Sequence, residues 1–312
     1  METQKNKYLI DEELHKLERI KLFPNIYIYP FVNIFMGLYR FRTDEKVSVR
    51  KTFIHGFQGY KISTLVIEPR QCSAKSPCII FFHGGGLLLK ADKSHYQLAK
   101  WYAEKVNCKV VFPDYRLMPK YRFPYAVEDC YSVYDWVIDN ADELGIDKKR
   151  VILTGDSAGG NLAAAVTLMA RERSAALPVG VLMAYPVLDR RMNTESMRKF
   201  TDTPVFDSNL ARIFWDSYLR DSKNEHIEYA SPMESETLKG FPETYIEVAE
   251  FDCLHDDGIA FANRLESEGI KVELHEVRKA CHGFEVAFES NLVKESLSRR
   301  LKWINTLSDN MK

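Results

Sequence analysis

Three short runs of the sequence combine glycine with residue types that perform covalent chemistry. They are HGGG at residues 83–86, GDSAGG at 155–160 and HG at 282–283. The first two runs directly follow short apolar stretches typical of buried strands, and the third follows the last predicted strand. Glycine is favoured where the backbone turns sharply or approaches a ligand closely. We therefore expect three tight turns at the carboxyl ends of strands, where open sheets of parallel strands bind their ligands.

Ser157 lies at the centre of the second run, which has the G-x-S-x-G pattern of a turn that exposes a nucleophile. An apolar stretch at 151–154 precedes the pattern, and an alanine-rich, helix-forming stretch at 158–173 follows it. This strand–turn–helix context is the condition that the motif requires. We predict that Ser157 is a nucleophile whose hydroxyl projects from the turn.

A hydroxyl nucleophile needs a base, and the base needs a carboxylate that orients it. Among the eight histidines, only His282 lies in a loop between the last predicted strand and the last predicted helix. Asp252 closely follows a predicted strand, whereas Asp256 and Asp257 belong to the next helix start, where acidic residues cap free N–H groups. We predict a catalytic triad of Ser157, Asp252 and His282.

The HGGG run lacks side chains that would shield its backbone N–H groups. We assign the amides of Gly85, Gly86 and Ala158 as the oxyanion hole, because such donors stabilise the tetrahedral intermediate of acyl transfer. His83 is expected to hold the loop rather than to transfer protons. Asp156 is expected to brace the turn around the nucleophile by hydrogen bonding.

From residue 60 onward, short apolar stretches alternate with longer stretches that have helical character. This alternation predicts a mostly parallel sheet covered by helices on both faces. Ser94 is a plausible N-cap for the first of these helices. The predicted strands are 62–68, 78–82, 109–112, 151–154, 180–184, 244–249 and 272–277, and the predicted helices are 94–106, 126–144, 158–173, 256–268 and about 292–307.

Two regions do not follow this alternation. Residues 1–45 precede the first strand, and residues from 187 to about 240 interrupt the pattern and include a predicted helix at 209–220. Long insertions between core elements commonly form lids or binding elements. We expect one α/β domain at 46–312, with an N-terminal cap segment at 1–45 and a cap insertion at about 187–240.

The composition is that of an ordinary globular protein, with 46% hydrophobic and 28% charged residues among 312. It excludes intrinsic disorder, and the net charge of −1 gives no basic footprint for nucleic acid. The six cysteines are scattered and form no C-x-x-C pair, which argues against a disulfide scaffold or a zinc ribbon. With no secretory apolar region near the start, the predicted location is cytoplasmic, and no metal or organic cofactor is expected.

Residues 22–39 are uncharged and lie between Lys21 and Arg40. The stretch is interrupted by two prolines, two asparagines and a glycine, so we predict no transmembrane span. The favoured interpretation is a broken segment that packs on the protein body or covers a pocket. Contact with a membrane surface through this aromatic-rich stretch stays open as an alternative.

Together, these motifs resemble the hormone-sensitive-lipase-like family of α/β-hydrolases, which are mostly carboxylesterases of the bacterial, acetyl-esterase type. The resemblance spans residues 60–307 and implies an eight-stranded, mostly parallel sheet with a helical cap. It also implies the same triad, in the chain order Ser157, Asp252, His282, and the same oxyanion hole. The matching motifs are HGGG at 83–86, DYRLMP at 114–119, FPYAVED at 123–129, GDSAGG at 155–160, DCL at 252–254 and HGF at 282–284.

Two positions depart from the family pattern. Leu87 stands where an aromatic residue often follows HGGG, and Cys253 stands where a proline commonly follows the aspartate. These departures concern substrate preference rather than chemistry. We expect a serine carboxylesterase that cleaves short- to medium-chain acyl esters of small molecules. An amidase or deacetylase using the same triad remains an alternative, as does a non-catalytic ligand-binding homologue.

Overall fold

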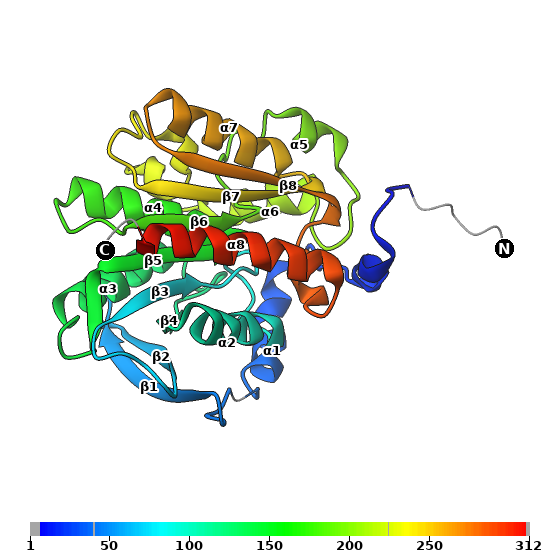
Figure 1. The fold of residues 1–312 in the computed structure, drawn as a ribbon. Coiled ribbons are helices and arrows are strands. Elements are labelled where there is room, and N and C mark those ends of the chain that lie inside the picture. The colour runs from blue at the N-terminus through cyan, green and yellow to red at the C-terminus, as the bar shows by residue number, and fades with distance from the viewer. Residues whose placement is uncertain (1–6, 40, 224, 310–312) are drawn as a thin grey trace.

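The alternating apolar stretches form one eight-stranded sheet in the computed structural model, which describes residues 7–39, 41–223 and 225–309 (Figure 1). The strand order is β1-β2-β4-β3-β5-β6-β7-β8. Strand β2 is antiparallel to both β1 and β4, and all other neighbours are parallel. The expected eight-stranded, mostly parallel sheet is confirmed. The strands are β1 Val47–His55, β2 Lys61–Pro69, β3 Ser76–Phe82, β4 Lys109–Asp114, β5 Ile146–Asp156, β6 Gly180–Ala184, β7 Glu243–Phe251 and β8 Val272–Cys281.

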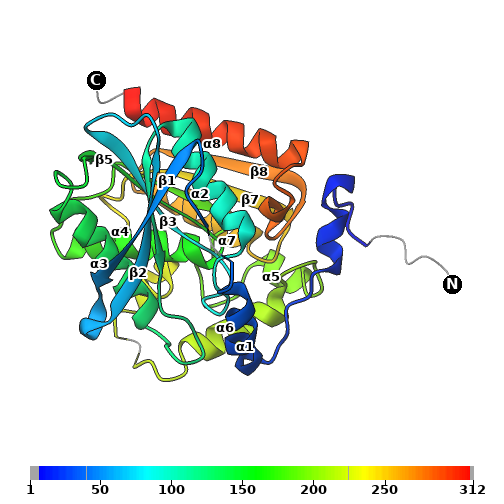
Figure 2. The same ribbon diagram turned by 90° about the horizontal axis from the view of Figure 1, so that it is seen from below.

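Helices cover both faces of this sheet, as the views in Figures 1 and 2 show. One face packs against α2 (Lys93–Val106) and α8 (Asn291–Asp309) in a core cluster that contains Tyr102 and Trp303. The other face packs against α3 (Tyr125–Asp139), α4 (Ala158–Glu172) and α7 (His255–Ser267). Burying apolar surface on both faces explains why the central strands read as continuous apolar runs.

The remaining helices belong to the two regions outside the alternation or to connecting loops. The α-helices are α1 Tyr29–Met36, α5 Glu195–Lys199 and α6 Ser208–Tyr218, and the 3-10 helices are Glu12–Arg19, Ile26–Ile28, Phe57–Gly59, Ile227–Tyr229, Pro232–Glu234 and Phe284–Ala287. The N-terminal segment and the insertion meet: Lys21 forms an isolated parallel β-bridge with Val205, and Arg220 donates to the Tyr27 hydroxyl at 3.3 Å. Among the described residues, no helix is both long and apolar enough to cross a membrane.

The structure corrects three details of the predicted elements. The sequence pattern missed β1, because this antiparallel edge strand exposes Arg50 and Lys51 and buries little beyond its ends. The N-cap of α2 is Asp92 rather than Ser94, since the Asp92 carboxylate accepts the Ser94 amide at 2.8 Å. Helix α3 ends at Asp139, five residues earlier than predicted, where the Asn140 side chain donates to a carbonyl of the last turn.

Candidate active site

Ser157 occupies a strained turn between β5 and α4. Its backbone adopts φ 54° and ψ −119°, a conformation that non-glycine residues rarely adopt, and its amide donates to the carbonyl of Ala184 at 2.8 Å. The flanking glycines are sterically required: a Cβ atom on Gly159 would lie 1.9 Å from the carbonyl oxygen of Phe82. The turn therefore sits close against β3 and projects the serine hydroxyl from the carboxyl edge of the sheet.

The structure brings the three predicted triad residues into one hydrogen-bonded chain. His282 follows β8, and its Nε2 lies 2.9 Å from the Oγ atom of Ser157. Its Nδ1 lies 2.7 Å from Oδ2 of Asp252, which follows β7. A carboxylate can only accept, so Nδ1–H donates to Asp252 and leaves Nε2 to accept the serine proton. All three side chains are buried. The arrangement can deprotonate a hydroxyl nucleophile.

The predicted oxyanion donors lie beside the serine. Gly85 and Gly86 have φ values of +99° and +62°, which turn this loop in a way that favours glycine, and both line the same cavity as Ser157. Ala158 is the first residue of α4, where an amide has no intrahelical partner. Within the described part of the chain, none of these three amides donates to a protein acceptor. They are free to bind a substrate oxygen.

Asp156 ties this loop to the serine turn. Its Oδ1 accepts the amide of Gly84 at 2.9 Å, and its Oδ2 lies 3.3 Å from Nε2 of His95. The other ring nitrogen of His95 lies 2.9 Å from the Asp92 carboxylate. Burial alone would lower the pKa of His95, but the Asp156 and Asp92 carboxylates raise it well above its usual range. Burial likewise opposes the charge on Asp156, yet the His95 charge holds its pKa below the ordinary value. A largely buried ion pair thus anchors the loop that carries the predicted oxyanion donors.

His83 holds the same loop from the other side. Its Nδ1 lies 2.7 Å from the carbonyl of Gly84, and Tyr115 donates its hydroxyl to the His83 carbonyl at 2.6 Å. The two rings stack with centroids 4.5 Å apart. Burial lowers the pKa of His83 to about 4, so the ring is neutral near neutral pH. These contacts support a structural role for His83.

Replacing Asp156 with Asn is expected to lower kcat for ester hydrolysis by about ten- to a hundredfold and to change KM little. The amide keeps the size of the side chain but loses the ion pair with His95, so the Gly84 amide is held less firmly, and small displacements of catalytic groups cost rates of this order. Steady-state kinetics on a soluble ester provide the measurement. A rise in KM with kcat unchanged would place Asp156 in substrate binding instead. Lys93→Met, on the first turn of α2, is the control.

The triad opens into a cavity of about 200 Å³ whose walls come from both regions outside the core alternation. From the N-terminal segment the cavity receives Ile20, Leu22, Phe23, Ile26, Tyr29 and Met36, and from the insertion it receives Val205, Phe206, Leu210, Ile213 and Phe214. Five aromatic side chains occur in residues 200–218 of the insertion. Phe206 and Phe214 line this cavity; all five are buried, the other three being Phe200, Trp215 and Tyr218.

The residues packed around His282 include Tyr185, which sequence reasoning missed together with the buried network behind it. The rings of Tyr185 and Phe206 each lie 4.9 Å from the imidazole, centroid to centroid. Tyr185 donates its hydroxyl to the buried carboxylate of Glu285, which in turn pairs with Arg300 of α8. No sequence motif indicates this network. Tyr185, Glu285 and Arg300 come from distant elements, so their pairing depends on the tertiary fold.

The two cysteines adjacent to the triad are buried thiols. Burial raises the pKa of Cys281 to about 12 and that of Cys253 well above its usual range. Thiolates are the reactive form of cysteine, so these side chains behave as packing residues.

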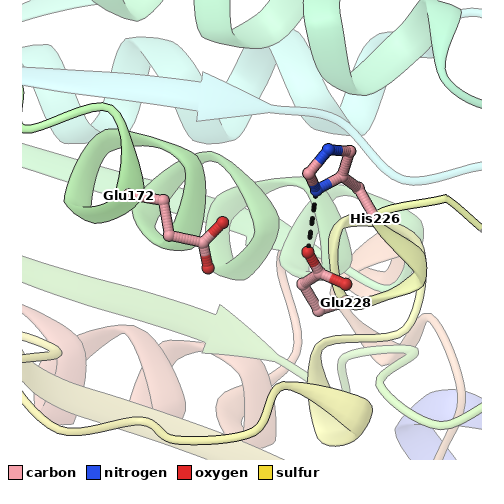
Figure 3. A group of neighbouring side chains, drawn as sticks. All are labelled: Glu172, His226 and Glu228. Carbon is pink, nitrogen blue, oxygen red and sulfur yellow. Dashed lines mark hydrogen bonds and ion pairs between the residues drawn. The ribbon is translucent and has the colours of Figure 1, made fainter.

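A second cluster, far from the triad, combines potential metal ligands: Glu172 at the end of α4, and His226 and Glu228 in the insertion (Figure 3). Their ligand atoms lie within 4.8 Å of one another. Glu172 also contacts the guanidinium of Arg171 at 3.3 Å and accepts the Tyr229 hydroxyl. Glu172 and His226 are exposed, and His226 pairs with the half-buried Glu228 at 3.2 Å, so the cluster gives no independent indication of an ion.

Comparison with known proteins defines the class. The model of a family described by its alpha/beta hydrolase fold matches residues 79–286, so the chain belongs to that family. An arylesterase of Saccharolobus solfataricus is 35% identical over 208 residues, 66% of this chain and 67% of the relative. Esterase LipI of Mycobacterium tuberculosis is 32% identical over 227 residues, 72% of this chain and 71% of the relative.

Solved structures of esterases have the same overall fold as this chain. A bacterial heroin esterase superposes with a TM-score of 0.87 at 28% identity, over 96% of this chain and 98% of that chain. Esterase LipW from Mycobacterium marinum gives a TM-score of 0.85 at 27% identity, over 96% of both chains. These relatives confirm the resemblance found in the sequence and the prediction of a carboxylic ester hydrolase at the level of the enzyme class.

Proposed function

We propose that the chain is a serine carboxylesterase that hydrolyses short- to medium-chain acyl esters of small molecules, with Ser157, His282 and Asp252 as the catalytic triad. The observation that carries this proposal is the continuous hydrogen-bonded chain from Asp252 through His282 to the Ser157 hydroxyl, at the wall of an apolar cavity. Bulk water has little access to such a site, which strengthens electrostatic stabilisation of a developing charge.

In this mechanism Ser157 attacks the ester carbonyl while His282 takes its proton at Nε2. Asp252 fixes the imidazole tautomer and stabilises the resulting cation. The amides of Gly85, Gly86 and Ala158 bind the oxyanion of the tetrahedral intermediate. His282 then protonates the departing alcohol, leaving an acyl-serine. Water, deprotonated by His282, attacks the acyl group, and return of the proton to Ser157 releases the carboxylic acid.

The proposal assigns residues 1–45 and about 187–240 to a cap over a core domain at 46–312. Of these, residues 1–6, 40 and 224 lie outside the described residues. Side chains from both regions line the cavity, which supports a role in acyl or alcohol selection. The cavity volume of about 200 Å³ supports short to medium acyl chains rather than long ones. The scattered cysteine pattern supports a cytoplasmic location.

The test is hydrolysis of p-nitrophenyl esters from acetyl to palmitoyl, alongside the matching p-nitroanilides. We expect the highest kcat/KM with short and medium acyl chains, and slower cleavage of the anilides because an amide is the less reactive carbonyl. Faster cleavage of anilides would favour an amidase, and a folded protein inactive on every ester and anilide would favour a ligand-binding homologue. A palmitoyl preference would contradict the proposed chain length.

A further inference from the structure

The outward face of the N-terminal segment is a row of large apolar side chains, which we name the outer stripe: Tyr27, Phe31, Ile34, Phe35 and Leu38. Their spacing of three to four residues places them on one face of α1 and its flanking turns. Phe31 is 68% exposed and Phe35 is 73% exposed. Soluble proteins rarely gather exposed apolar side chains in this way without a binding role.

The opposite face of this segment is fixed to the catalytic body. Ile26, Tyr29 and Met36 line the cavity that holds Ser157. Asn33 binds the loop that follows HGGG through both of its side-chain polar atoms: it donates to the Leu88 carbonyl at 2.7 Å and accepts the Lys90 amide at 2.9 Å. The inner face therefore packs on the cavity and on the loop at residues 88–90, and this packing leaves the outer stripe facing outward.

The segment that carries the outer stripe has cationic but no acidic side chains. Residues 20–43 contain three cationic side chains and no aspartate or glutamate. From other elements, Arg220 donates to the Tyr27 hydroxyl at 3.3 Å, and the Lys90 ammonium reaches within 3.9 Å of the Cβ position of Gly37. The Lys90 ammonium also donates to the Asp114 carboxylate, with Nζ 3.4 Å from Oδ2. An apolar, aromatic face bordered by cations complements an anionic lipid surface, where the rings enter the interface and the cations meet headgroups.

We propose that the outer stripe docks this protein on the surface of an anionic phospholipid bilayer. The segment lies in the interface without crossing the bilayer, since α1 has eight residues and begins at a Tyr-Pro pair. Phe23 both lines the cavity and is largely exposed, so docking brings the cavity wall next to the lipid. This binding goes beyond the proposed hydrolysis and does not depend on it.

Vesicle co-sedimentation tests the proposal. The wild type is expected to bind vesicles of phosphatidylcholine mixed with phosphatidylglycerol, to bind pure phosphatidylcholine more weakly, and to be released by salt. Phe31→Ser with Phe35→Ser is expected to lower the partition coefficient at least about tenfold. Phe53→Ser is the matched control, because Phe53 is 60% exposed on β1, outside the segment, and this variant should bind like the wild type.

Two further measurements make the result decisive. Neither Phe31 nor Phe35 lines the cavity, so the double variant should hydrolyse a soluble short ester at the wild-type rate, which shows that it is folded. Light scattering reports whether the stripe instead joins two copies of the chain. The proposal is overturned if the wild type fails to bind anionic vesicles, if the double variant binds as well as Phe53→Ser, or if the wild type is a dimer that the double variant dissociates.

Discussion

Ser157→Ala and His282→Ala are each expected to lower kcat/KM for a short p-nitrophenyl ester by at least about a thousandfold, and the double variant is expected to lose little more. The reason is the single hydrogen-bonded chain that joins the two side chains at 2.9 Å. Once either member is lost, the other has no partner with which to form a nucleophile. Residual activity is expected from the proposed oxyanion amides and from substrate binding, which neither substitution removes.

Steady-state kinetics provide these values, and labelling with a fluorophosphonate identifies the nucleophile directly. The wild type should be labelled at Ser157, Ser157→Ala should not be labelled, and His282→Ala should be labelled far more slowly. Ser298→Ala, on an exposed turn of α8, is the matched control and should keep full activity. If Ser157→Ala retained more than about a tenth of the wild-type activity, the triad assignment would be wrong.

The parts of the site that the sequence predicts are those whose geometry is local. The turn around Ser157 requires Gly159 because the backbone there packs directly against Phe82. This local requirement is visible in the sequence as the G-x-S-x-G motif. Gly85 and Gly86 likewise indicate positive φ angles, which the structure has at both positions. The order of strands and helices can also be predicted from the sequence, because strands and helices bury apolar residues with different periods.

The parts that the sequence does not predict depend on long-range packing. The cavity walls formed by Ile26 and Met36 come from a segment that is apolar on its outward face as well, so the sequence does not show which side faces inward. Hydrogen bonds between Asn33 and a distant loop fix that direction. Strand β1 escapes detection because it lies at the sheet edge. The buried charges near His282 leave no signal, since a charged residue in a helix is usually a solvated one.

Arg300 is the clearest of these hidden features. It lies on α8 with 1% exposure and donates to Glu247 of β7 and to Glu285, both of which are also buried. Glu247 accepts further hydrogen bonds from Tyr245 and Ser296 at 2.8 Å. Burial alone would raise the pKa of Glu247, but the Arg300 charge holds it below the ordinary value. Arg300 thus keeps the pKa of Glu247 low, whereas burial still raises the pKa of Glu285 above its ordinary value.

Arg300→Met is expected to destabilise the protein by about 3–5 kcal/mol, because removing one partner of a buried ion pair leaves uncompensated charge. Urea unfolding near neutral pH measures this loss. The matched control is Arg299→Met. Arg299, the preceding residue of α8, forms a surface ion pair with Glu295 at 2.7 Å, and such exposed pairs contribute about 0–1 kcal/mol. An equal loss in both variants would show that the buried pairing contributes nothing specific.

The pH dependence of the Arg300→Met loss has a definite sign. In the wild type, the depressed pKa of Glu247 means that its stabilising contribution is present above the unfolded-state pKa of about 4.3 and is lost as pH falls through the lower folded-state value. In the variant, the Arg300 charge no longer opposes burial. The folded-state pKa of Glu247 therefore rises, and its neutral, protonated form is favoured. The difference in unfolding free energy between wild type and variant should therefore narrow as the pH falls from about 7 towards 5.

Adding Glu247→Gln to Arg300→Met is expected to recover part of the lost stability near neutral pH. The second substitution removes one of the two stranded carboxylates while keeping the size of the side chain and an oxygen that accepts from Tyr245 and Ser296. The same Glu247→Gln substitution alone should destabilise the protein, because it leaves Arg300 only partly paired. This opposite sign in the two backgrounds distinguishes electrostatic compensation from packing, since a purely steric effect of Glu247→Gln would have the same sign in both.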